Sequence, residues 1–102
     1  MRPGSTFLTD PDVIAATVGT TSGLVLPPAE NRGVVWVHNP SLTATIAVAT
    51  VSSGVTPSAT APVAGQITLT PGETIIADNS RLTGGLNAAA SAANSPLTIW
   101  IF

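Results

Sequence analysis

The sequence predicts an all-β fold of about seven or eight antiparallel strands, packed as a two-sheet sandwich. Short runs rich in Val, Ile and Thr alternate along the chain with turn residues, among them nine Gly and nine Pro. Hydrophobic residues make up 44% of the chain and the net charge is only −2, a balance that favours a folded core over disorder. With 102 residues, the chain has the size of one domain.

The N-terminal segment, residues 1–12, contains two prolines and shows no hydrophobic period. It is therefore predicted to form an extended arm that precedes a single sandwich domain at residues 13–102. Phe7 and Leu8 are the apolar pair of this arm, which makes them candidates for contact with a neighbouring protein.

Glycine, proline and asparagine mark the ends of the early strands. One strand is predicted over residues 13–18, ending at Gly19, and the next over 24–26, ending at a Pro-Pro pair. A later strand over 43–51 is expected to form a hairpin with the strand before it, through the Asn-Pro-Ser turn at 39–41.

The clearest strand is predicted over residues 32–39, which follow a short polar stretch and end before a proline. It is apolar on both faces, because Val35 and Val37 alternate with Trp36. A strand of this kind is expected in the middle of a sheet, and Trp36 is assigned to the core.

A second hairpin is predicted around a Thr-Pro-Gly-Glu turn. Residues 66–70 alternate strictly, with Ile67 and Leu69 expected to face inward. The turn at 70–73 has the type II signature, because Pro fixes the first central φ and Gly permits the positive second one. Residues 74–77 are expected to be the partner strand.

The last part of the chain is predicted to be a loop followed by a strand. Residues 79–96 are assigned to a long loop, and one helical turn in their Ala run is the alternative for 84–95. The final strand covers 97–102. Its alternate apolar residues are assigned to the core: Leu97, Ile99 and Ile101. Trp100 and Phe102 face the other way and are assigned to a surface that another subunit covers.

The composition includes few residues that could serve as catalytic groups. Only 8% of residues are charged, no Cys is present, and His38 is the one histidine. A hydrolytic site needs a nucleophile, a base and an orienting group, so His38 is interpreted as a structural or interface residue and the chain as a non-enzyme. The Asp10/Asp12 pair is interpreted as turn-capping rather than metal-binding, and no cofactor is expected.

Charge and hydropathy also exclude several classes of binding partner. Three basic residues are too few for a nucleic-acid site or an anionic membrane surface, and no small-molecule substrate is expected. The start of the chain lacks the apolar run of a secretory signal, and no stretch is long enough to span a membrane. Synthesis in a cytoplasm is therefore expected.

Three elements resemble those of small virion proteins of tailed bacteriophages. They are an Arg-led strand ending in Asn-x-Ser over 32–41, the Leu-Thr-Pro-Gly-Glu-Thr-Ile motif at 69–75, and the terminal strand at 97–102. The resemblance covers roughly residues 30–102. It implies a compact β-sandwich in which the 69–75 motif forms a hairpin. It also implies a role as a capsid decoration (cement), head-fibre or tail-accessory subunit. The two-sheet sandwich itself is expected to be of jelly-roll or immunoglobulin-like type.

The expected function is therefore that of a capsid decoration subunit, which binds the outer surface of a viral head and reinforces it. Its partners would be the major capsid protein and further copies of itself, for example in a trimer, since symmetry multiplies a modest contact. Two alternatives stay open: another virion location (head–tail connector, tail or fibre base) and a carbohydrate-binding module in which Trp36 and Trp100 stack on sugar.

Overall fold

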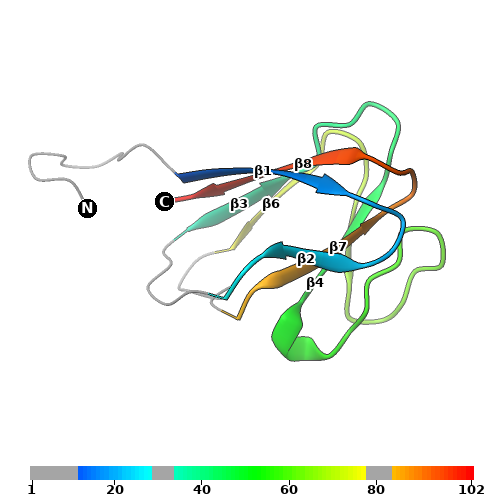
Figure 1. Cartoon of the computed structure of the whole chain (residues 1–102), viewed down its shortest axis with the longest axis horizontal. Helices are drawn as coiled ribbons and strands as arrows, with labels where there is room; N and C mark the ends of the chain where they lie inside the picture. The colour runs from blue at the N-terminus through cyan, green and yellow to red at the C-terminus, as the bar shows by residue number, and fades with distance from the viewer. Residues whose placement is uncertain (1–11, 29–33, 78–83) are drawn as a thin grey trace, which may run out of the picture.

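The computed structural model describes residues 12–28, 34–77 and 84–102 and shows an all-β chain. Figure 1 shows the strands arranged in two facing layers. The eight strands of the described segments are β1 (Asp12–Val18), β2 (Gly23–Leu26), β3 (Val35–His38), β4 (Ile46–Thr50), β5 (Ile67–Leu69), β6 (Thr74–Ala77), β7 (Leu86–Ala90) and β8 (Ser95–Ile101). A single 3₁₀ turn, Val51–Ser53, follows β4. The predicted two-sheet sandwich is confirmed.

The strand order identifies the sandwich as a jelly roll. One sheet has the order β1-β8-β3-β6 and the other β2-β7-β4-β5, and all pairs are antiparallel. The first strand thus pairs with the last, the second with the seventh, the third with the sixth and the fourth with the fifth. This nested pairing is the jelly-roll arrangement and differs from the immunoglobulin order, in which the first two strands are neighbours.

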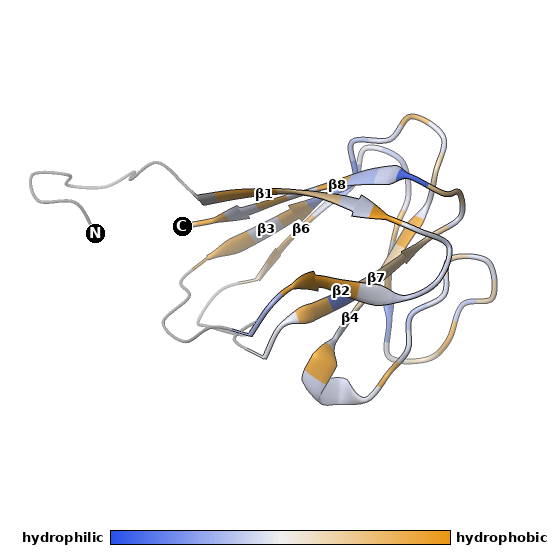
Figure 2. Cartoon of the chain, viewed as in Figure 1, coloured by the Kyte–Doolittle hydropathy of each residue, from blue (hydrophilic) through white to orange (hydrophobic). Residues whose placement is uncertain are grey.

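The core lies between the two sheets. Figure 2 shows that strongly apolar residues are concentrated in the strands. The buried apolar cluster is Val18, Leu26, Val35, Val37, Ile46, Val48, Leu69, Leu86, Ala88, Ala90, Leu97 and Ile99. The assignment of Leu97 and Ile99 to the core is confirmed, and Ile101 packs against the cluster while staying partly exposed. Ile67 was expected to face inward with Leu69, but it is 51% exposed because β5 is the edge strand of its sheet.

Neither predicted hairpin forms, although both turns are present. β3 and β4 lie in different sheets, and so do β5 and β6. The turn at 70–73 has the expected geometry: Gly72 has φ +84°, and the Glu73 N–H donates to the Thr70 carbonyl oxygen at 3.0 Å. A turn motif specifies how the chain reverses locally, but the strands it joins pair only if both stay in one layer. Here both turns carry the chain from one sheet to the other.

Asn39 holds the two crossing connections together from a fully buried position. Its side-chain amide donates to the carbonyl oxygens of Ala44 (2.8 Å) and Leu69 (3.0 Å), and its side-chain oxygen accepts from the Ser41 N–H (3.0 Å). Its backbone also bonds to the second turn, donating to Glu73 and accepting from Gly72. The residue predicted to open a hairpin turn therefore joins the β3–β4 connection to the β5–β6 turn.

The predicted loop at 79–96 is wrong in its middle part, as is the helical alternative, because residues 86–90 form β7 in the interior of a sheet. Three consecutive alanines of this strand are buried: Ala88, Ala89 and Ala90. Alanine has low strand propensity, but here its small side chain fits between closely packed neighbours. Gly85 precedes the strand at φ +93°, and a Cβ there would lie 2.7 Å from the carbonyl oxygen of Leu26.

The predicted arm, residues 1–12, falls almost entirely outside the described residues, and so do Phe7 and Leu8; Asp12 is the first residue of β1. In residues 12–28, 34–77 and 84–102, no helix has the length and hydropathy needed to cross a bilayer.

Glu73 gives the 70–73 turn a dependence on pH. A hydrogen bond from the Thr70 hydroxyl, followed by one from the Thr70 backbone N–H, lowers the pKa of the Glu73 carboxyl below its ordinary value of 4.5. A carboxyl with a lowered folded-state pKa contributes stability above its unfolded pKa and loses it as the pH falls. The melting temperature of Glu73→Gln should therefore fall less than that of the wild type as the pH drops below about 4.5. Thermal melts of both proteins from pH 7 to pH 3 would measure the difference. Parallel curves for the two proteins would contradict this assignment.

Candidate binding groove

Four large apolar side chains form a row across the outer face of the β1-β8-β3-β6 sheet. In the strand register, Val13 lies opposite Trp100, Trp100 opposite Trp36, and Trp36 opposite Ile76. Each is exposed: Val13 by 56%, Trp100 by 40%, Trp36 by 39% and Ile76 by 62%. We call these four residues the apolar row.

Strand alternation explains why the row faces outward. Val35 and Val37 fill the core, so Trp36 between them points to the other side, and the same holds for Trp100 beside the buried Ile99. The assignment of Trp36 to the core is therefore wrong, because small branched side chains already occupy the narrow space between the sheets. Trp100 lies on the outer surface, as the sequence indicated.

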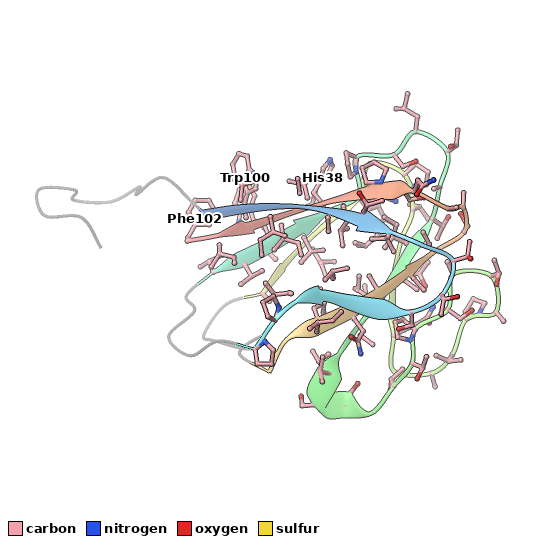
Figure 3. The ribbon with its side chains drawn as sticks, in the orientation of Figure 1. His38, Trp100 and Phe102 are labelled. Carbon is pink, nitrogen blue, oxygen red and sulfur yellow. The ribbon has the colours of Figure 1, made fainter. Side chains whose placement is uncertain are left out.

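The aromatic side chains on this face form one cluster. The indole rings of Trp36 and Trp100 are nearly parallel, at 11°, with centroids 6.3 Å apart. The Phe102 ring lies 5.5 Å from Trp36 and 6.3 Å from Trp100. Figure 3 shows Trp100 and Phe102 on the side of the sheet that faces away from β2 and β7. Aromatic pairs at these distances stabilise one another, so the rings keep a defined orientation.

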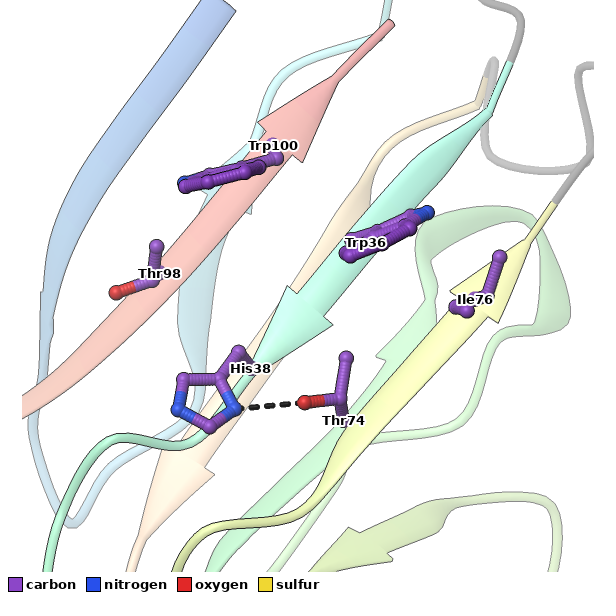
Figure 4. Close-up of a pocket in the computed structure, with 6 residues that line it drawn as sticks. All are labelled: Trp36, His38, Thr74, Ile76, Thr98 and Trp100. Carbon is purple, nitrogen blue, oxygen red and sulfur yellow. Dashed lines mark hydrogen bonds between the residues drawn. The ribbon is translucent and has the colours of Figure 1, made fainter. Parts of the chain in front are cut away.

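A second row, one pleat further along the same face, is mostly polar. Ala15 lies opposite Thr98, Thr98 opposite His38, and His38 opposite Thr74. The His38 Nδ1 atom and the Thr74 hydroxyl are 2.7 Å apart and hydrogen-bonded (Figure 4). We call these residues the polar row. The pleat places it beside the indole pair, because residues two apart on a strand share a face.

The two rows enclose a shallow groove of about 400 Å³. It is lined by Trp36, His38, Thr74, Ile76, Thr98 and Trp100. None of these residues is Asp, Glu, Lys or Arg. Within the described part of the chain, no hydrogen-bond partner is found for the two indole N–H groups, the Thr98 hydroxyl or the His38 Nε2 atom. The groove thus combines an aromatic wall with hydrogen-bonding groups that remain available to a ligand.

The six lining residues do not include all the groups of a catalytic triad. His38 contacts a hydroxyl, but the six lining residues include no carboxylate that could orient its imidazole and complete a triad. In residues 12–28, 34–77 and 84–102, no three His, Cys, Asp or Glu side chains are grouped closely enough to hold a metal ion. Asp10 of the Asp10/Asp12 pair lies outside these segments.

The structure brings together two of the four predicted interface residues, Trp100 and Phe102, while Phe7 and Leu8 lie outside the described residues. Sequence reasoning missed that Trp36 and His38 belong to the same face as Trp100. Alternation with Val35 and Val37 was the available signal for this. It could not be used without knowing that β3 and β8 are neighbours.

A scan against protein-family models, a search of curated proteins and a search of solved structures each find no match to this chain.

Proposed function

We propose that the chain is a non-catalytic structural subunit of a virion, which decorates the outer surface of the capsid and contacts it through the apolar row. The observation that carries this proposal is the in-register line of exposed apolar residues from Val13 to Ile76, which spans all four strands of one sheet. Monomeric proteins rarely expose such contiguous apolar surface unless a partner covers it.

The composition of the groove supports a protein partner. Interface centres are depleted in charge and enriched in aromatic side chains, and the lining residues share both properties. The sheet also provides a rigid platform, because its other face is fixed to the core through residues such as Val37 and Ile99. A rigid face whose groove contains no Asp, Glu, Lys or Arg loses little entropy and desolvates few charges on binding.

Many copies of the subunit on one particle would make a modest contact effective. Each copy would cover its apolar row against the major capsid protein, and contacts between copies, for example in a trimer, would add avidity. The protein would be made in the host cytoplasm and carried on the virion. A position at the head–tail connector, tail or fibre base is the alternative location for the same contact.

Replacing Trp100 by Ala should reduce co-sedimentation of the protein with phage particles by about tenfold or more, the size of effect expected for a central aromatic anchor. Leu24→Ala is the matched control, because Leu24 is an exposed apolar residue of the other sheet. Electron microscopy of the labelled protein on the particles then distinguishes heads from tails. Equal sedimentation of the wild type and both variants would refute the apolar row as the contact surface.

A further inference from the structure

We propose that the groove takes an uncharged, proline-containing extended segment of the partner protein, which lies along the apolar row and crosses the four strands. This inference rests on the proposed function and names the chemistry of the partner at that surface. It is carried by the length of the row, the charge of the groove and the kind of hydrogen-bonding groups that remain free.

The length of the row fits a short extended segment. Val13 and Ile76 lie on the two edge strands, three strand spacings apart, a distance of about 14 Å. A polyproline II segment rises about 3.1 Å per residue, so four to five residues would cover the row. The aliphatic ends of the row suit apolar side chains at the ends of such a segment.

The free indole N–H groups require hydrogen-bond acceptors on the ligand. The indole N–H groups of Trp36 and Trp100 can only donate, and the Thr98 hydroxyl and the His38 ring can also take part. A polyproline II segment presents backbone carbonyl oxygens without internal hydrogen bonds, and its prolines have no N–H that would need a partner. The two indole N–H groups, which only donate, thus match a proline-containing segment better than an ordinary strand, which brings its own donors.

The charge of the groove also favours an uncharged, proline-containing segment. No Asp, Glu, Lys or Arg lines the groove, so a segment with a carboxylate, ammonium or guanidinium group would cover that charge without an oppositely charged partner of these types, at a high cost. Proline rings are neutral and apolar, and aromatic-lined grooves are the surfaces on which such segments dock elsewhere in proteins.

A sugar ring is the competing ligand for paired indoles beside hydroxyls. It would cover the indole pair alone and leave the exposed Val13 and Ile76 side chains uncovered. The extension of the row to both sheet edges therefore favours the peptide.

The experiment is a fluorescence titration of the whole protein with a blocked hexaproline peptide. The chain has two Trp and no Tyr, and both Trp lie in the groove, so the intrinsic emission reports on this site alone. We expect a saturable change with hexaproline and none with a blocked Gly-Ser peptide of equal length. Glucose, galactose and N-acetylglucosamine form the sugar arm of the experiment.

Three variants locate the contact. Trp100→Ala should weaken hexaproline binding by about tenfold or more, with Trp36 as the remaining reporter, and Thr98→Val should weaken it by a smaller factor. Trp100→Phe keeps a ring and removes the indole N–H, so it should bind with intermediate affinity even if Trp100→Ala is poorly folded. Leu24→Ala should bind as the wild type does. A thermal melt of each variant identifies losses that are due to unfolding.

Saturable binding of a sugar without binding of hexaproline would overturn the inference, as would hexaproline binding that none of the groove variants changes. Particle co-sedimentation separates this result from the proposed function. A protein that sediments in a Trp100-dependent manner but ignores hexaproline refutes the proline-containing segment alone. A protein that binds hexaproline but no particle refutes the virion role.

Discussion

Ile99→Ala is expected to lower the free energy of unfolding by about 2 to 5 kcal/mol, the usual cost of truncating a large residue in a closed core. Ile99 is fully buried in β8 and lies opposite Ile14 on one neighbouring strand and Val37 on the other. Truncation would leave a cavity at the centre of the sheet, where the backbone cannot move in to fill it. Urea denaturation followed by circular dichroism measures the loss.

The adjacent residue on the same strand is the control. Trp100→Ala removes ring contacts on a partly exposed face, each worth about 0.5 to 1.5 kcal/mol, and should cost clearly less stability than Ile99→Ala. If the two variants unfold at the same urea concentration, Trp100 serves the fold rather than a partner, and the docking surface is misassigned.

Asn39→Ala is expected to cost about 2 to 4 kcal/mol, as the breaking of a buried hydrogen-bond network does. The substitution removes both donors of the side-chain amide and leaves the carbonyl oxygens of Ala44 and Leu69 without that partner. It also leaves the Ser41 N–H without its side-chain acceptor and opens a small void. Because these bonds join the two crossing connections, both crossings should loosen together, which amide hydrogen exchange around Leu69 and Ala44 would detect.

Two further variants make this result specific. Asn39→Asp keeps the shape but replaces the amide donors by a charge, so it should destabilise the fold at neutral pH at least as much as Asn39→Ala. Asn87→Ala, at a half-buried position in β7, should cost less. A loss for Asn39→Ala no larger than that for Asn87→Ala would show that the network does not hold the crossings.

Local patterns were sufficient to predict most of the strands. Alternating or wholly apolar runs bounded by Gly and Pro correspond to every strand from β1 to β6 and to β8, because these signals act within a few neighbouring residues. β7 was not predicted, because its alanines have no strand preference of their own. They become strand residues because β2 and β4 flank them in the sheet.

Which strands pair with one another could not be predicted from the sequence. The turns at 39–41 and 70–73 are present, yet both cross between layers, and the distinction depends on how eight strands share one core. The same dependence applies to the groove. Sequence alternation placed Trp100 on an outer face, but only the pairing of β3 with β8 brings Trp36 beside it and forms the groove.

The amino-acid sequence by itself determined the all-β class, the positions of the turns, the inward side of β8 and the near absence of charge, since each depends on residue type and short-range spacing. The tertiary structure alone decided the nested strand order, the role of Asn39 and the alignment of Val13, Trp100, Trp36 and Ile76 in one row. These features join residues that are far apart in the chain. Their positions follow from burying two apolar sheet faces against each other, a constraint that no local window of sequence contains.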